Sequence, residues 1–293
     1  MCHSLPPLRG VRGVTGRFGA RLAAAVAERG PLCAGVDPHP GLLRAWDLPA
    51  DVSGLERFAL TATEAVAGDV AVLKPQSAFF EAFGSAGIAV LERVIAAGRA
   101  AGALVLLDVK RGDIGSTMAA YAAAYLTDGA PLAADAVTVS PYLGFGSLEP
   151  ALTAARDSGR GLFVLARTSN PDGAELQNAV PPRGGTVAQS IVDEAAACNA
   201  GARPSGDVGV VVGATNRPGE LDLGSLNGPI LAPGFGAQGA GPAELARLFG
   251  GPDGPLRHVL PASSREILRH GPDAAALRAA VRKAQDALAS LPR

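Results

Sequence analysis

The residues of this chain best suited to chemistry are two lysines set among aspartates. Lys110 stands between Asp108 and Asp113, and Lys74 lies further upstream. These are the only two lysines among the first 280 residues, in a chain that otherwise uses arginine for its positive charge. Lysine can release its proton, whereas the guanidinium group of arginine stays charged. This choice of residue favours a chemical role for the two lysines over scattered surface charge.

Asp37, Lys74 and Asp108 each stand at or next to the end of a short apolar run, and Lys110 follows shortly after Asp108. If the runs are strands of a parallel barrel, these ends lie together at the face where such barrels build their active sites. A buried charge is costly unless an opposite charge lies beside it, so alternating acidic and basic residues stabilise one another. We expect these four side chains to form one cluster.

Asp113 and Thr117 are spaced i and i+4, which places them on one face if a helix has begun by that point. An aspartate at such a position also suits simple helix capping, with its carboxylate near the positive N-terminus. Capping accounts for Asp113 but explains neither Asp108 nor Lys110.

A glycine-rich segment, Pro-Gly-Phe-Gly-Ala-Gln-Gly, occupies 233–239. Its G-x-G-x-x-G spacing also occurs in dinucleotide-binding units, but there it follows the first strand and needs an acidic residue about 20 positions on. Position 259 is Val, which disfavours that interpretation. The backbone N–H groups of such a loop suit an anion, and barrels often bind phosphate after strands seven and eight. Gln238 and Arg265, which follows Ser264, are expected to converge on one phosphate.

Eight short apolar runs alternate with Ala-rich amphipathic segments along the chain. Continuous apolar runs suit strands buried on both faces, as in a parallel sheet covered by helices. The number of runs and the total length favour an α/β fold, a single (β/α)8 barrel. Alternation alone also fits a doubly wound open sheet. The runs are 32–37, 70–75, 103–108, 135–140, 161–166, 207–212, 229–233 and 257–262.

Helices are predicted between these runs, and an extra N-terminal helix at 17–29 precedes the first of them. A weaker helical pattern lies near 218–224. The polar stretch 168–184 is predicted to be a long loop, which is either functional or a tolerated surface insertion. The other expected helices are 54–67, 85–101, 115–127, 147–158, 185–200, 241–249 and 273–290.

Composition excludes several classes of protein. With 26 basic and 27 acidic residues among 293, the net charge of −1 gives no basic surplus for nucleic acid. A hydrophobic content of 48% excludes a disordered chain. No apolar run approaches the about 18 residues of a membrane span, and the first residues lack a signal-peptide pattern. The cysteines and histidines show no metal-ligand spacing, so we expect a cytoplasmic protein with no metal and no membrane partner.

No linker divides the chain into separate domains. The 38 glycines and 23 prolines stand largely at the joints between predicted elements, where turns need them. We expect 1–16 to be a poorly ordered N-terminal segment and 17–293 to form one catalytic barrel domain.

The string D-x-K-R-x-D-I-x-x-T at 108–117 resembles the signature of the orotidine 5′-phosphate decarboxylase family. Asp37, Lys74, the segment 233–238 and the pair Ser264–Arg265 extend the resemblance over about residues 30 to 270. The sequence SPYLGFGSLEP at 140–150 resembles the longer bacterial branch of this family.

This resemblance implies a homodimeric barrel that converts orotidine 5′-phosphate to UMP and CO₂ without a cofactor. Lys110 would donate the proton, and Asp113 and Thr117 would reach into the partner subunit's site. The loop from Pro233 to Pro242 would close over the phosphate as a lid. The charged tetrad implied is Lys74, Asp108, Lys110 and Asp113. The substrate-binding residues implied are Asp37 and Lys74 for the ribose, Ile114 and Thr117, Thr168 and Ser169 for the pyrimidine, and Pro233, Gln238, Ser264 and Arg265 for the phosphate.

Two departures from the family pattern and two alternatives stand beside this interpretation. The family often has glycine where Ser264 precedes the phosphate arginine, and the 168–184 loop is longer than in compact members. Magnesium-dependent relatives of the 3-keto-gulonate 6-phosphate decarboxylase or hexulose phosphate synthase type would carry a carboxylate where Lys74 stands. A catalytically inactive nucleotide-phosphate-binding barrel would need a broken tetrad, and all four charged positions are present.

Overall fold

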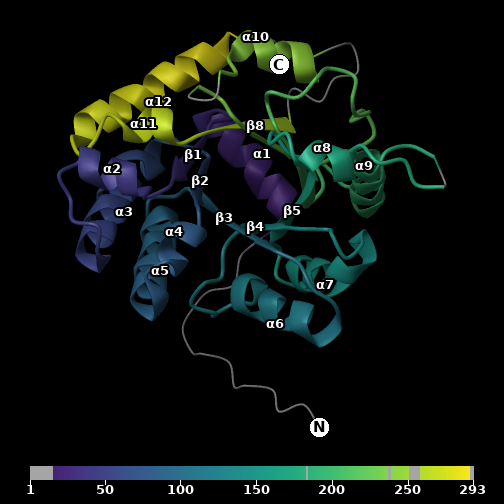
Figure 1. Ribbon diagram of the computed structural model, residues 1–293, viewed down its shortest axis with the longest axis horizontal. Coiled ribbons are helices and arrows are strands. Elements are labelled where there is room, and N and C mark those ends of the chain that lie inside the picture. The colour runs from purple at the N-terminus through teal and green to yellow at the C-terminus, as the bar shows by residue number, and fades with distance from the viewer. Residues whose placement is uncertain (1–15, 183, 237–238, 251–257, 291–293) are drawn as a thin grey trace.

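The computed structural model describes residues 16–182, 184–236, 239–250 and 258–290. Eight parallel strands follow one another in chain order, and β1 pairs with β8, so the sheet closes into a barrel with helices around it (Figure 1). The predicted barrel is confirmed, and the open doubly wound sheet is wrong. Of the predicted N-terminal segment 1–16, residues 1–15 lie outside the described residues.

All eight predicted strands are present and almost wholly buried, because helices cover their outer faces. β3 extends to Arg111, past its predicted end at 108, so both Asp108 and Lys110 belong to the strand itself. The strands are β1 (Cys33–Val36), β2 (Val72–Pro75), β3 (Leu104–Arg111), β4 (Ala136–Val139), β5 (Gly161–Arg167), β6 (Val208–Val212), β7 (Ile230–Pro233) and β8 (Val259–Ser263).

The long predicted helices are also present, but the helix expected near 218–224 is wrong. That stretch forms turns, since Pro218 has no N–H to donate and Gly219 adopts a left-handed φ of 78°. The confirmed helices are α1 (Phe18–Arg29), α3 (Val52–Val66), α5 (Gly84–Ala100), α6 (Gly115–Leu126), α7 (Glu149–Asp157), α9 (Val187–Cys198), α10 (Pro242–Phe249) and α12 (Ala274–Ala289).

Several short helices lie in segments where no helix is predicted. They have four to six residues, too few for an apolar period to show in the sequence. One of them, α8, occupies the centre of the predicted 168–184 loop. The short α-helices are α2 (Pro40–Ala45), α4 (Ala78–Glu81), α8 (Gly173–Gln177) and α11 (Arg265–Leu268), and the 3-10 helices η1 and η2 cover Ala67–Asp69 and Phe145–Leu148.

The inside of the barrel is a core of its own, closed at the amino end of the strands by α1. Phe18 and Leu22 of α1 pack on the inward-facing side chains, and the Phe18 ring meets that of Phe163 edge to face at 6.0 Å. Gly161 begins β5 because the Phe18 ring occupies the space that a Cβ atom would need. Burial of a side chain of this size stabilises the fold by about 1.5–3 kcal/mol, so α1 anchors the barrel that holds the site.

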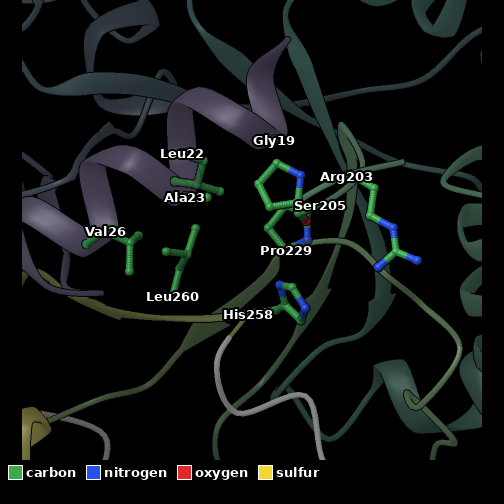
Figure 2. Close-up of a pocket in the computed structure, with 11 residues that line it drawn as sticks. Gly19, Leu22, Ala23, Val26, Arg203, Ser205, Pro229, His258 and Leu260 are labelled. Atoms are coloured by element: carbon green, nitrogen blue, oxygen red, sulfur yellow. The ribbon is translucent and has the colours of Figure 1, made fainter. Parts of the chain in front are cut away.

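A cavity of about 760 Å³ lies at this amino end, between α1 and the entries to β7 and β8. Figure 2 shows Leu22, Val26 and Leu260 on its apolar side and Arg203 and His258 on its polar side. It is larger than the two cavities at the carboxyl ends of the strands. However, none of the charged residues expected to do chemistry lines it, so size alone points to the wrong end of the barrel.

No helix within the described ranges is both long and apolar enough to cross a lipid bilayer.

Candidate active site

Three neighbouring strands bring the predicted charged residues together at the carboxyl end of the barrel. Asp37 directly follows β1, Lys74 lies in β2, and Asp108 and Lys110 lie in β3. The Asp108 carboxylate accepts hydrogen bonds from both ammonium groups, at 3.1 Å from Lys74 Nζ and 2.6 Å from Lys110 Nζ. Asp37 Oδ1 lies 4.0 Å from Lys74 Nζ. The four side chains form one series of alternating charges.

Burial and ion pairing act in opposite directions on the two innermost charges. Burial alone would lower the pKa of Lys74, but the carboxylates of Asp108 and Asp37 outweigh it and raise this pKa above its ordinary value. Burial alone would raise the pKa of Asp108, but the ammonium groups of Lys74 and Lys110 hold it well below its ordinary value. Lys74 and Asp108 therefore both stay charged at neutral pH.

Asp108→Asn is expected to lower the melting temperature Tm by about 5 °C at pH 7, because Lys74 stays buried with one acidic neighbour fewer. A carboxyl whose pKa is lowered by folding stabilises the protein above its ordinary pKa of about 3.9, and this contribution is lost as the pH falls through the folded value. The difference in Tm between wild type and variant should therefore shrink below about pH 4.

Thermal melts across this pH range measure the effect, with Asp286→Asn on the exposed face of α12 as the matched control. The control should keep a Tm close to that of the wild type at every pH. If the Tm difference between wild type and Asp108→Asn stayed constant down to acid pH, this would contradict a lowered pKa for Asp108.

Two further partners of Asp108 belong to no sequence motif. Gln76 Nε2 donates to Asp108 Oδ2 at 2.9 Å, and Thr138 Oγ1 donates to Oδ1 at 2.8 Å. Each carboxylate oxygen thus accepts from one ammonium group and one neutral donor. The sequence feature that could have identified them is their position relative to the strands. Gln76 directly follows β2, and Thr138 is the polar residue inside the apolar strand β4. Neighbouring strands of a barrel turn such residues toward one mouth.

Lys110 holds an unusual backbone conformation. Its φ of 46° lies in the left-handed region, which costs a residue with a Cβ atom about 1–2 kcal/mol. Its side chain is nevertheless 46% exposed, so the ammonium group pairs with Asp108 and also faces the barrel mouth. Backbone strain of this kind concentrates at functional sites.

The residues after β3 do not join this cluster in the same chain. Asp113 Oδ1 accepts from the Ile114 N–H at 2.8 Å, and no ion pair to Asp113 occurs within the part of the chain that the structure describes. Because α6 begins at Gly115, Asp113 precedes the helix, and the expected i, i+4 face with Thr117 does not form. Ile114 is the N-cap residue, so helix capping by Asp113 is also wrong. Ile114 and Thr117 are exposed.

A cavity of about 110 Å³ lies between the charged cluster and the ends of β7 and β8. The Oγ atoms of Ser263 and Ser264 are buried there and have no hydrogen-bond partner among the described residues. Ser264 packs over Gly35, where a Cβ atom would approach Ser264 Cβ to 2.6 Å. A buried hydroxyl without a partner is costly, so these groups suit a polar ligand. The pocket is lined by Gly35, Asp37, Lys74, Pro233, Gly234, Phe235, Ala262, Ser263, Ser264 and Arg265.

The glycine loop after β7 folds as a tight turn beside this cavity. Gly234, Gly236 and Gly239 all have left-handed φ values, of 111°, 83° and 94°, which explains the need for glycine at this spacing. The turn closes through the Gly236 N–H, which donates to the Ala240 carbonyl at 2.8 Å. Gln238 lies outside the described residues. The loop stands at the seventh strand of a closed barrel, so its place fits an anion-binding loop rather than a dinucleotide-binding unit.

The structure separates the roles of Thr168 and Ser169 at the end of β5. The Thr168 hydroxyl is engaged on both sides, since it donates to Asn170 Oδ1 at 2.7 Å and accepts from Gln177 Nε2 at 2.8 Å. Ser169 is exposed, and its hydroxyl has no hydrogen-bond partner among the residues described. Gln177 belongs to the unpredicted helix α8, so Thr168 holds the 168–184 loop while Ser169 remains available to a ligand.

Comparison with known proteins agrees with this geometry. A family model described as orotidine 5′-phosphate decarboxylase / HUMPS matches residues 30–280, which is most of the chain. The chain belongs to this family. A relative from Salinispora arenicola named orotidine 5′-phosphate decarboxylase is 63% identical over 263 residues, covering 90% of this chain and 94% of the relative. A relative of the same name from Streptomyces coelicolor is 61% identical over 264 residues, with the same coverage.

Solved structures of the family share this fold. A chain from Streptomyces avermitilis is 57% identical and superposes with a TM-score of 0.91, covering 94% of this chain and 95% of its own length. The OMP decarboxylase of Leishmania donovani is 30% identical with a TM-score of 0.71, covering 94% of this chain and 98% of its own length.

Proposed function

We propose that this chain is an orotidine 5′-phosphate decarboxylase, a lyase of de novo pyrimidine biosynthesis that forms UMP and CO₂ without a cofactor. The observation that carries the proposal is the ion-paired series Asp37, Lys74, Asp108 and Lys110 beside a polar cavity at the carboxyl end of the barrel. The curated relatives at 61–63% identity carry the same activity in their names.

Lys74 separates this function from the magnesium-dependent members expected on the same barrel. Those enzymes are expected to place a metal-binding carboxylate on the second strand, where this chain has a buried ammonium group that would repel the cation. No group of three or more His, Cys, Asp or Glu side chains that could hold a metal occurs within the described ranges. A catalytically inactive barrel is disfavoured because Lys74, Asp108 and Lys110 are intact and paired.

In the proposed reaction, the bond between C6 of the pyrimidine and its carboxylate carbon breaks. CO₂ leaves, and the electron pair of the bond remains on C6. The Lys110 ammonium group stabilises this charge more strongly in the transition state than in the substrate, which is what accelerates a reaction. Lys110 then transfers a proton to C6 to give UMP. Asp108, 2.6 Å from Lys110 Nζ, orients the ammonium group.

The remaining substrate contacts are assigned by position at the barrel mouth. Asp37 and Lys74, which line the smaller cavity, would bind the ribose hydroxyls. Ser169 rather than Thr168 would meet the pyrimidine, because the Thr168 hydroxyl is already bonded to Asn170 and Gln177. The phosphate lies at the end of the substrate remote from C6. Its binding would supply free energy to orient the substrate and to close the 233–242 loop as a lid. We assign the phosphate to Pro233, Gln238, Ser264 and Arg265.

We further propose a homodimer in which Asp113 and Thr117 complete the site of the partner subunit. Ile114 is 61% exposed, and the loop after β4, whose Ser140 N–H donates to the Arg111 carbonyl at the end of β3, exposes Tyr142 by 75% and Leu143 by 52%. Large apolar side chains exposed on such neighbouring segments mark an interaction surface. A second copy would cover them and would bring Asp113, which has no basic partner among the described residues of its own chain, to another copy's Lys110.

The proposed domain and location follow from the same features. Residues 17–293 would act as one catalytic domain. The two described cysteines, Cys33 and Cys198, are free, which suits the reducing cytoplasm. Burial raises the pKa of the Cys33 thiol to about 12, so this cysteine stays neutral beneath the charged cluster and acts as a core side chain.

The purified enzyme should decarboxylate orotidine 5′-phosphate equally fast with and without EDTA, because Lys110 rather than a metal ion stabilises the carbanion. Loss of the substrate's absorbance measures the rate, and added Mg²⁺ should not increase it. A rate abolished by EDTA and restored by Mg²⁺ would overturn the cofactor-free mechanism, and no consumption of the substrate at all would overturn the function itself.

A further inference from the structure

One buried hydroxyl contacts both catalytic residues of β3. Thr138, the polar residue within β4, is 1% exposed. Its Oγ1 donates to Asp108 Oδ1 at 2.8 Å and accepts from the backbone N–H groups of Val109 and Lys110, at 3.0 Å and 2.9 Å. A hydroxyl has one proton to donate and two lone pairs to accept with, so these contacts use it completely.

These contacts lie where the ladder between β3 and β4 is interrupted. Leu107 pairs with Val137, but the next pair is Arg111 with Val139. Between these two pairs β3 therefore contains two more residues than β4. The N–H groups of Val109 and Lys110 therefore turn to the Thr138 side chain instead of a strand carbonyl. Bulges re-aim side chains and are common beside active sites. Here the bulge contains the left-handed residue Lys110.

Packing alone does not require a hydroxyl at this position. Valine has almost the same shape as threonine and at least as strong a preference for buried strands. Valine would, however, leave the buried Val109 N–H and the partly buried Lys110 N–H without this acceptor, and it would remove one donor from Asp108. The hydroxyl at position 138 is therefore needed for its hydrogen bonds to Asp108 and to the backbone at Lys110, and not for packing.

We propose that Thr138 is a positioning residue for the decarboxylation, a role that rests on the proposed function. Its single hydroxyl holds the Asp108 carboxylate and the left-handed Lys110 backbone in one fixed relation. The ammonium group of Lys110 is thereby aimed at the carbon from which CO₂ leaves. Thr138 touches no substrate itself and acts through these two residues.

Thr138→Val should lower kcat by about 10²-fold, because small displacements of a catalytic group have effects of this size. The dissociation constant of UMP, measured by calorimetry, should change by less than about threefold, since uniform binding is not affected. Calorimetry also counts the binding sites, so kcat is expressed per intact site and a partly unfolded sample does not mimic the effect. Thr63→Val on α3, another fully buried threonine, is the matched control and should leave kcat unchanged.

A pair of smaller variants tests the same point if valine disturbs folding. Thr138→Ser and Thr138→Ala both lose the methyl group, but only serine keeps the hydroxyl. Serine should retain kcat within about fivefold of the wild type, whereas alanine should lose about 10²-fold.

A value of kcat per site for Thr138→Ala within about threefold of that for Thr138→Ser would overturn the positioning role. A wild-type enzyme that does not consume orotidine 5′-phosphate would instead overturn the proposed function, so the two failures are distinguishable.

Discussion

Lys110→Ala is expected to lower kcat by about 10³-fold or more, while binding of UMP stays measurable. The variant removes both the charge beside C6 and the proton that C6 receives, and these interactions matter most in the transition state. The phosphate and ribose contacts are separate from Lys110 and remain, so the affinity for product is largely kept. Steady-state assays and calorimetry with UMP measure the two quantities.

The matched control is Lys283→Ala, which removes the chain's third lysine from an exposed position on α12. It should have the kcat of the wild type. Turnover by Lys110→Ala near the wild-type level would contradict the assignment of Lys110 as proton donor, and complete loss of UMP binding would show that its main role is in binding.

Mixing Lys110→Ala subunits with Asp113→Ala subunits should restore activity that neither variant has alone. Each variant has two defective sites as a homodimer. A hybrid dimer combines both defects in one site and leaves the other site with an intact Lys110 and an intact Asp113. Random re-pairing should therefore recover about a quarter of the wild-type activity, if the dimer is symmetric and the sites are shared.

The control for this experiment mixes Lys110→Ala with Asp108→Asn. These two residues are hydrogen-bonded within one chain at 2.6 Å, so every site of that hybrid is defective and no activity should return. Equal recovery of activity in both mixtures would contradict shared sites, because no dimer in the control mixture contains an intact site. No recovery in the first mixture, with hybrid dimers demonstrated, would show that Asp113 does not act across the interface.

The sequence identifies the residues of the charged cluster because their positions depend on local pattern. Asp37, Lys74 and Asp108 stand at the ends of apolar runs, and parallel strands in a barrel bring such ends to one mouth whatever the loops do. The same runs predict all eight strands. The short helices α2, α4, α8 and α11 escape prediction because they are shorter than two helical turns.

Contacts that depend on register or on a distant loop are not encoded in any local pattern. The proposed choice of Ser169 over Thr168 depends on Gln177, which reaches Thr168 only because α8 forms inside the long loop. The position of Asp113 outside the same-chain cluster depends on where α6 begins. Cavity size does not locate the active site either, since the cavity of about 760 Å³ lies at the amino end of the strands, opposite the charged cluster.

By itself, the sequence determined the barrel, the chemical character of its mouth and the family, because strand period, charge placement and motif spacing are all local properties. Only the tertiary structure decided how the charges are held. Asp108 receives its Thr138 donor from a neighbouring strand, through a two-residue offset between β3 and β4. That offset is set by packing across the whole barrel, and therefore it leaves no trace in the order of residues along the chain.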